Sequence, residues 1–393
     1  MRNRARAGDL QVFVNEGFDL VIVGGGLQAL LLALTVRDRA PGARVAIVER
    51  DARLGGNHTW CFHDTDVTPE MAARIAPLVV ARWQGHDVAF PRYQRTLAGG
   101  YAALASDGVD AAIRATGATV ITGAGAEAIA PGEVRLSDNR TLRGAWVIDA
   151  RGPGRLQAGG GLGYQKFVGL ELALAAPHGL MRPVLMDACV PQQDGYRFLY
   201  VLPLAADRLL VEDTYFSDRA DLDVEAIAGE CRAYADAHGW RGELVRREHG
   251  VLPLPWSASI APVQPGLIVA GYAGGWLHPV TGYSLPAAAR LAEAIAGGLV
   301  AGDVEAAVTA AARAQADQLA FTSRMTRMMF RWFRPAERRG ALEHFYRLPE
   351  DVIARFYAMT LTRRDRARIF FRRPPRGLSW RALVTGAHAG ELA

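Results

Sequence analysis

Two adjacent carboxylates, Glu212 and Asp213, follow an apolar run in the segment Leu209–Thr214. A carboxyl group in apolar surroundings has a raised pKa and can stay protonated. When two carboxylates are neighbours, one of them tends to keep its proton. Such an acid can protonate a very weak base, such as a hydrocarbon double bond, if water is excluded. The alternative is a solvated carboxylate at a strand end, the common state of an acidic side chain.

The residues around this pair alternate between apolar and polar, as in 196–202 and 208–212, with turn residues between the runs. This pattern predicts antiparallel strands over 160–258, which would form a substrate-binding lobe. Successive side chains of a strand point to opposite faces, so Glu212 and Asp213 should not face the same pocket. At most one of them is expected to meet a substrate directly.

The N-terminal part carries a dinucleotide-binding pattern. The aliphatic run 19–23 predicts a buried parallel strand, and Gly24-x-Gly26-x-x-Ala29 leads from it into a Leu/Ala-rich helix. A second strand, 44–49, ends in Glu49, which would bind the adenosine ribose. Glycine allows the backbone to approach a pyrophosphate, whose charge is favoured at the N-terminus of a helix.

Three further segments favour FAD over NAD, because they resemble segments of large two-domain flavoproteins: 54–60 with its glycine pair, 146–152, and the glycine-rich turn 267–275. In those flavoproteins the last turn carries an aspartate that binds the ribityl chain, and here it has no acid. We expect backbone amides of Gly274 to Gly282 to take that role. The residues expected to contact FAD are Gly24, Gly26, Leu27, Ala29, Glu49, Arg50, Gly56, His58, Thr59, Asp149, Gly152, Gly271, Gly274, Gly275, His278 and Gly282.

These patterns predict an α/β protein: a Rossmann-type FAD-binding domain of a two-domain flavoprotein, an antiparallel sheet lobe and a helical C-terminal region. The expected division is an N-terminal tail (1–18), a discontinuous FAD-binding domain (19–155 and 260–300), the substrate lobe (160–258) and a basic helical region (301–393).

Composition narrows the partners. The net charge of +5 is modest, so it does not argue for nucleic acid. Three widely spaced cysteines without a CxxC motif indicate reduced, cytosolic surroundings. We find no signal peptide, no segment apolar enough to span a bilayer and no metal-ligand spacing. The expected location is cytoplasmic and peripheral to the membrane, and the oligomeric state cannot be deduced.

Five segments together resemble the bacterial lycopene β-cyclase family: 57–60 (Asn-His-Thr-Trp), 194–204, Glu212-Asp213-Thr214, 278–285 (His-Pro-Val-Thr-Gly-Tyr-Ser-Leu) and 348–357. The resemblance extends from residue 19 to about 375. It implies that lycopene, and other acyclic carotenes as further substrates, would be cyclised through γ-carotene to β-carotene. It also implies reduced FAD, NAD(P)H as its reductant and no net redox change. Glu212 matches the family's acid or base, and Asp213 is then a supporting residue.

The chemistry of such a reaction leaves alternatives open. Protonation of a terminal alkene gives a tertiary cation, which the next double bond attacks, and loss of a proton fixes the product. Reduced flavin can donate the proton or stabilise the cation, so the division of labour with Glu212 stays open. Aromatic rings can stabilise a cation, although each can equally be a core residue. The candidates to line the substrate path are Trp60, Tyr196, Tyr215, Trp276 and Tyr283.

Two other function classes remain at this point: a redox flavoenzyme, such as a monooxygenase or desaturase acting on an apolar isoprenoid, and a non-catalytic lipid-binding flavoprotein. The C-terminal region has two interpretations as well. The segment 324–334 interleaves Arg324, Arg327, Arg331 and Arg334 with methionines and aromatic residues. It can be ordinary helix core or a membrane-docking face.

Overall fold

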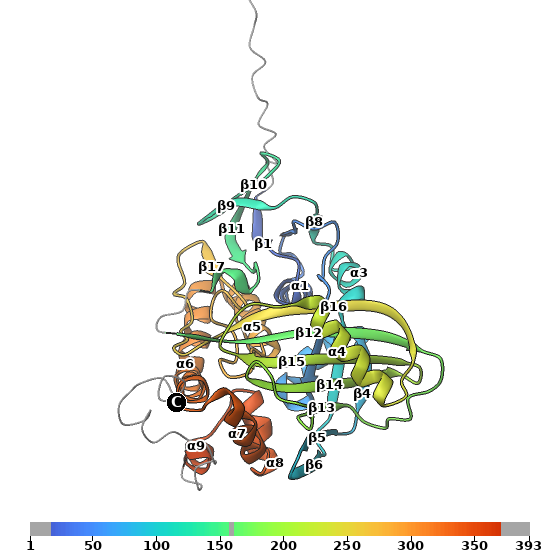
Figure 1. The fold of residues 1–393 in the computed structure, drawn as a ribbon. Coiled ribbons are helices and arrows are strands. Elements are labelled where there is room, and N and C mark those ends of the chain that lie inside the picture. The colour runs from blue at the N-terminus through green and yellow to red at the C-terminus, as the bar shows by residue number, and fades with distance from the viewer. Residues whose placement is uncertain (1–16, 157–160, 371–393) are drawn as a thin grey trace, which may run out of the picture.

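A mostly parallel sheet forms the dinucleotide-binding part of the computed structural model, which describes residues 17–156 and 161–370 (Figure 1). Strand β1 lies between β2 and β11, both parallel to it, and β8 and β17 extend this parallel core. The antiparallel strands β9 and β10 continue the sheet beyond β11. The strands are β1 (Phe18–Val23), β2 (Val45–Val48), β8 (Thr119–Ile121), β9 (Ala126–Ala130), β10 (Glu133–Leu136), β11 (Thr141–Asp149) and β17 (Leu267–Val269).

Helix α1 (Leu27–Arg39) follows β1 directly, as the glycine-rich turn predicts. Its first ten residues are all buried, and it packs against α5 (Leu285–Ala301), which follows β17 much later in the chain. A continuous apolar cluster joins the two helices to the parallel strands. This layer therefore holds residues distant in sequence around the glycine turn.

A three-stranded sheet and two short helices lie beside this layer. The sheet has the order β3-β7-β4, and Thr59 to His63 on β3 pair with β7. The elements are β3 (Thr59–His63), β4 (Val79–Trp83), β7 (Tyr101–Ala105), α2 (Pro69–Ile75) and α3 (Val109–Arg114).

The second large sheet is almost entirely antiparallel and has the order β16-β12-β15-β14-β13-β5-β6. Helix α4 (Val224–Ala237) packs on one face of it, in front of β12 and β15 in Figure 1. Its two last strands come from residues 86–97, within the segment that the sequence assigned to FAD binding. The strands are β5 (His86–Phe90), β6 (Tyr93–Leu97), β12 (Leu162–Leu174), β13 (Val184–Asp187), β14 (Tyr196–Ala205), β15 (Arg208–Ser217) and β16 (Gly242–Pro255).

Four helices form the C-terminal part of the described chain: α6 (Val304–Arg331), α7 (Arg338–Phe345), α8 (Glu350–Tyr357) and α9 (Arg363–Phe370). The interpretation of 324–334 as an apolar docking face was wrong for its main side chains. Met325, Met329, Phe330 and Phe333 are buried, the first three in a cluster shared with the second sheet. Residues 371–393 of the expected C-terminal region and 1–16 of the expected N-terminal tail lie outside the described residues. Among the residues described, no helix combines the length and apolar character that a membrane span requires.

Candidate active site

One large cavity, about 930 Å³ in volume, connects the glycine turn after β1 with the inner face of the second sheet. Its lining includes Gly24 and Glu49 at one end and Glu212 and Tyr357 elsewhere along the wall. The predicted site residues that line it are Gly24, Gly26, Leu27, Glu49, Arg50, Gly56, His58, Thr59, Trp60, Gly152, Glu212, Gly271, Gly282 and Tyr283. Residues from 24 to 283 thus meet in one continuous space.

The geometry of the glycine turn matches the dinucleotide pattern. Gly24 has φ +103°, and a Cβ there would lie 2.6 Å from the carbonyl oxygen of Ala150, so a larger residue is excluded. Gly26 has open space around its Cα. Glu49 accepts a hydrogen bond of 2.8 Å from the amide of Gly25 and another from the amide of Asp51, which fixes its carboxylate at the cavity edge.

Five of the residues expected to contact FAD are absent from the cavity wall: Ala29, Asp149, Gly274, Gly275 and His278. Ala29 lies in the buried core beside α5. The carboxylate of Asp149 is paired with Arg151, which itself lines the cavity. The expected direct contacts of these five residues with FAD are therefore corrected. At the end of β11, Arg151 lines the cavity in place of Asp149.

The turn that follows β17 uses its own backbone amides. The amide of Gly274 donates to Ala270, that of Gly275 to Tyr272 and that of Gly282 to His278. These three amides have acceptors inside the turn, whereas Gly282 also lines the cavity, so the role of the amides of Gly274 to Gly282 at the ribityl chain stays a prediction. Two buried amide oxygens that line the cavity, on Gln28 and Gln165, have no hydrogen-bond partner. Sequence reasoning missed both glutamines.

His278 holds the C-terminal helices in place. Its Nε2 is 3.0 Å from the carbonyl oxygen of Phe356, and its Nδ1 accepts from the amide of Val280 at 3.2 Å. Burial lowers the pKa of His278 to about 4, so the ring is neutral near pH 7. This packing brings Tyr357, the neighbour of Phe356, to the cavity wall, where its hydroxyl meets that of Tyr346 at 2.6 Å.

Glu212 projects from β15 into the cavity. Its Oε1 accepts a hydrogen bond of 2.9 Å from the hydroxyl of Thr214, two residues along the same face of the strand. Leu210 and Leu202 line the wall beside it. Burial and the negative charge of Glu248 raise the pKa of Glu212 well above its ordinary value. This shift favours the protonated form of the side chain, which catalysis on a weak base requires.

Asp213 lies on the opposite face, as strand alternation predicted. Its carboxylate is fully buried and pairs with Arg197, whose Nη2 is 2.7 Å from Oδ2. The hydroxyl of Tyr215 donates to the same oxygen at 3.0 Å. Asp213 therefore fixes β14 to β15 beneath α4 and does not reach the cavity.

Glu248 is the principal residue that sequence reasoning missed. It lies on β16, is 2% exposed and lines the cavity next to Glu212. Its Oε2 accepts from Arg246 Nη1 at 2.8 Å and from the hydroxyl of Thr59 at 3.2 Å. The signal in the sequence was weak, because Arg246-Arg-Glu-His249 is a charged run of the kind that usually faces solvent.

The aromatic candidates divide between cavity and core. Trp60 and Tyr283 line the cavity, whereas Tyr196, Tyr215 and Trp276 do not. Tyr215 faces Asp213, Tyr196 stacks on Phe198 inside the core, and Trp276 packs among the apolar residues around α1 and α5. The expectation that these three line the path was wrong. The cavity wall has other aromatic side chains instead: Tyr101, Phe167, Tyr200, Tyr272, Tyr346 and Tyr357.

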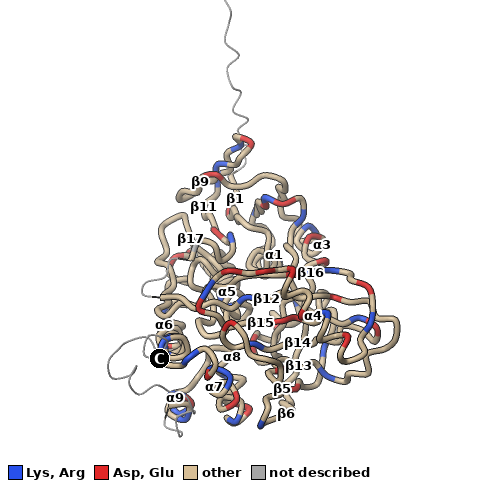
Figure 2. Tube along the Cα trace, viewed as in Figure 1, with Lys and Arg blue, Asp and Glu red and all other residues tan. Residues whose placement is uncertain are grey.

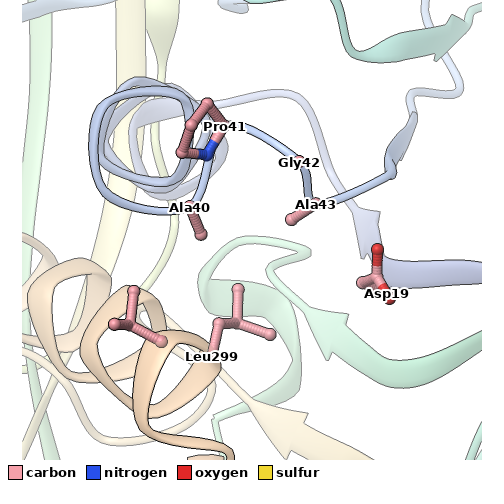
Figure 3. A pocket seen from close by; sticks show the side chains of 7 residues that line it. Asp19, Ala40, Pro41, Gly42, Ala43 and Leu299 are labelled. Atoms are coloured by element: carbon pink, nitrogen blue, oxygen red, sulfur yellow. The ribbon is translucent and has the colours of Figure 1, made fainter.

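A second hollow offers no comparable chemistry. It measures about 370 Å³ and is formed by the turn after α1 and the end of α5 (Figure 3). Its carboxylate, Asp19, accepts a hydrogen bond from the amide of Arg44. Among the described residues, no group of three or more histidine, cysteine and acidic side chains could hold a metal ion. The large cavity is therefore the candidate active site.

Comparison with known proteins shows the family to which this chain belongs. The family model described as "Lycopene cyclase protein" matches residues 19–382. The lycopene beta-cyclase of Paracoccus sp. (strain N81106 / MBIC 01143) is 39% identical over 366 residues, which are 91% of this chain and 94% of that protein. The chain belongs to the lycopene cyclase family. The lycopene beta-cyclase of Pantoea ananas is 38% identical, over 91% of this chain and 95% of the relative.

Solved structures of other proteins show the same fold. A geranylgeranyl bacteriochlorophyll reductase-like protein from Thermoplasma acidophilum matches with a TM-score of 0.61 and 13% identity, over 90% of this chain and 96% of that one. PqsL, a probable FAD-dependent monooxygenase from Pseudomonas aeruginosa, matches with a TM-score of 0.59 and 18% identity, over 84% and 98%. The predicted α/β flavoprotein fold of this lycopene cyclase family member is confirmed.

Proposed function

We propose that this chain is a lycopene β-cyclase, which closes the ends of lycopene through γ-carotene to β-carotene. Membership of the lycopene cyclase family supports this function. The observation that carries the mechanism is Glu212, a carboxyl with a raised pKa in the wall of a cavity that also contains the glycine turn. An enzyme that protonates an alkene needs such an acid in a site closed to water.

FAD fits the end of the cavity near β1. The open backbone at Gly26 can admit the pyrophosphate, Glu49 is fixed where the adenosine ribose would bind, and Arg151 lies at the same edge. We propose that the unpartnered oxygens of Gln28 and Gln165 accept hydrogen bonds from the hydroxyls of FAD, in place of the missing aspartate. When bound and reduced, FAD supplies negative charge or a proton beside the substrate.

The proton of Glu212 moves to the terminal alkene of lycopene, whose π electrons form the new C–H bond. The tertiary cation left behind is attacked by the next double bond, which closes a six-membered ring. Loss of a ring proton then forms the ring double bond. Protons and electrons balance, so the substrate and product have equal mass.

Aromatic rings on the cavity wall can stabilise the cation before the last proton leaves. Tyr200 pairs with Glu212 in register across β14 and β15, and both line the cavity. Trp60, Tyr346 and Tyr357 add further π faces. These aromatic rings would contact the long hydrocarbon and keep water away from the cation.

NAD(P)H is the proposed reductant of FAD, and related acyclic carotenes are further proposed substrates. Because lycopene is confined to the bilayer, we propose that the protein works at a membrane surface on the cytoplasmic side. Exposed arginines near the end of α6 and along α9 would favour anionic lipid.

Expression in cells that accumulate lycopene, followed by chromatography and mass analysis of the pigments, tests the function. We expect carotenes of unchanged mass with β-rings at one or both ends. A product with added oxygen or with fewer hydrogens would indicate a redox flavoenzyme instead. Unchanged lycopene, with folded and FAD-loaded protein in the cells, would contradict the cyclase assignment.

A further inference from the structure

Glu212 and Glu248 lie in one row across the second sheet. Glu212 of β15 pairs with Gly169 of β12, and Glu248 of β16 pairs with the same glycine from the other side. Their side chains lie on the same face of the sheet, and both line the cavity, with only Gly169 between them in the row. Figure 2 shows acidic residues on β15 and β16, on either side of β12.

The absence of a side chain at Gly169 lets the side chains of Glu212 and Glu248 approach each other. A Cβ at this position would lie 3.0 Å from Cγ of Glu248 and 3.3 Å from Cδ1 of Leu210. The two carboxyl groups therefore approach each other over the one residue in the row that has no side chain. Any larger residue would push Glu248 away.

The two acids have unequal surroundings. Glu248 has a cation, Arg246, and a hydroxyl, Thr59, on Oε2. Glu212 has the neutral hydroxyl of Thr214. Arg246 also donates to Glu171 at 3.0 Å, and Glu171 is paired with Arg208. These four residues, Glu248, Arg246, Glu171 and Arg208, balance two negative charges with two positive ones.

Glu212 has no ion pair with any residue that the structure describes. Asp213 does not change this balance, because Arg197 neutralises it on the other face. An uncompensated charge in a buried site is costly, so the shared proton belongs on Glu212 and the negative charge on Glu248. Strand register and ion pairing both lead to this arrangement.

We infer that Glu212 and Glu248 form one acid–base unit that shares a single proton, in which Glu248 is the ionised partner and Arg246 and Gly169 are positioning residues. The inference rests on the proposed cyclase function. The unit gives its proton to the alkene and briefly carries two negative charges beside the cation, which they stabilise. It then recovers a proton from the ring, whose C–H electron pair becomes the ring double bond. One proton leaves, one returns, and no oxidant is needed.

Infrared titration of the purified, FAD-loaded chain without carotene tests the shared proton directly. We expect a carbonyl band of a protonated carboxyl at neutral pH that Glu212→Gln removes. In Glu248→Gln the negative neighbour is lost while Arg246 remains, so this band should titrate at least about one pH unit lower. Arg246→Met removes the cation, so the band should titrate higher. Glu243→Gln, an exposed acid on the same strand, should leave it unchanged.

Activity on lycopene supplies the second measurement. The basic limb of the pH profile should move down in Glu248→Gln and up in Arg246→Met, and Gly169→Ala should lower the rate at least tenfold in a folded protein. An unmoved band and profile in Glu248→Gln would overturn the inference while leaving the cyclase function intact. Conversely, the expected band shifts without any ring formation by wild type would reject the proposed function and keep the shared proton.

Discussion

Asp213 and Arg197 form a buried ion pair on the face of the second sheet opposite to Glu212, with both carboxylate oxygens within 3.0 Å of the guanidinium. Glu230 of α4 adds a second carboxylate to the same Arg197 at 2.8 Å. The pair therefore ties two strands and a helix together. Two acids adjacent in sequence thus have separate tasks, one in stability and one in the cavity.

This separation predicts opposite outcomes for two conservative substitutions. Glu212→Gln removes the proton donor, so the rate of ring formation should fall at least about 100-fold. Its thermal stability should be unchanged or higher, because a buried ionisable group becomes a neutral amide. Pigment chromatography and thermal unfolding measure the two effects.

Asp213→Asn should instead cost about 3 kcal/mol of unfolding free energy, because Arg197 loses a buried partner. Glu230 and the amide oxygen of the new asparagine would still accept hydrogen bonds from Arg197, which limits the loss of unfolding free energy. Ring formation per folded molecule should stay within a few-fold of wild type. A folded Asp213→Asn protein that has lost cyclisation, beside an active Glu212→Gln, would reverse the assignment of the two acids.

Local patterns in the sequence predicted much of this site. The glycine turn fixed the position of Gly24 and Glu49, because a pyrophosphate site needs a close backbone approach at a strand–helix junction. Strand alternation separated Glu212 from Asp213, since the side-chain period of a strand is two. Both inferences depend only on residues that are neighbours along the chain.

Glu248 and Gln165 could not be predicted in this way. Glu248 reaches Glu212 only through the pairing of β16 and β15 with the same strand, and strand register is a property of the whole sheet. The predictions that Tyr215 lines the substrate path and that His278 contacts FAD were wrong for a related reason. Each is beside a motif in sequence, yet the ring of Tyr215 faces Asp213 and that of His278 faces Phe356.

Gln165 should contribute to FAD binding without contributing to the stability of the protein before FAD binds. Its Oε1 is buried in the cavity wall without a partner, which is unfavourable until a donor arrives. Gln165→Leu should therefore weaken FAD binding about tenfold and leave the melting temperature of the FAD-free protein equal or higher. Titration of the FAD-free protein with FAD, followed by flavin fluorescence, measures the affinity.

Gln94→Leu provides the matched control, because this glutamine is exposed on β6 away from the cavity. It should bind FAD as wild type does. Equal affinities in Gln165→Leu and wild type would show that this oxygen receives no hydrogen bond from FAD.

Buried histidines should make the protein sensitive to acid. Burial lowers the pKa of His63 to about 3, and that of His86 and His278 to about 4. The unfolded chain, with ordinary histidine pKa values, binds more protons than the folded one below about pH 6. Stability is therefore full above that pH and falls as pH drops towards 4, by about 1.4 kcal/mol per pH unit for each of these histidines.

Urea unfolding at several values of pH measures this slope. His278→Asn removes one titrating ring, so the unfolding free energy should fall by about 1.4 kcal/mol less per pH unit than in wild type. The variant should also be less stable at pH 7, because the contact with Phe356 is lost. Gln94→Leu, which changes an exposed side chain that does not titrate, is the control and should keep the wild-type slope. Parallel slopes in all three proteins would contradict the neutral, buried state of His278.

Membrane attraction should come from charge at the end of α6, since its large apolar side chains are buried. Arg324 and Arg327 are exposed and three residues apart on the helix, so they share one face. Arg324→Glu with Arg327→Glu should weaken binding to vesicles that contain anionic lipid by about tenfold, at roughly 1 kcal/mol or less per charge removed. Co-sedimentation measures this, with neutral vesicles and the surface variant Arg135→Glu on β10 as controls. Binding that is unaffected by the double reversal, or equally strong to neutral vesicles, would exclude this face as the electrostatic contact.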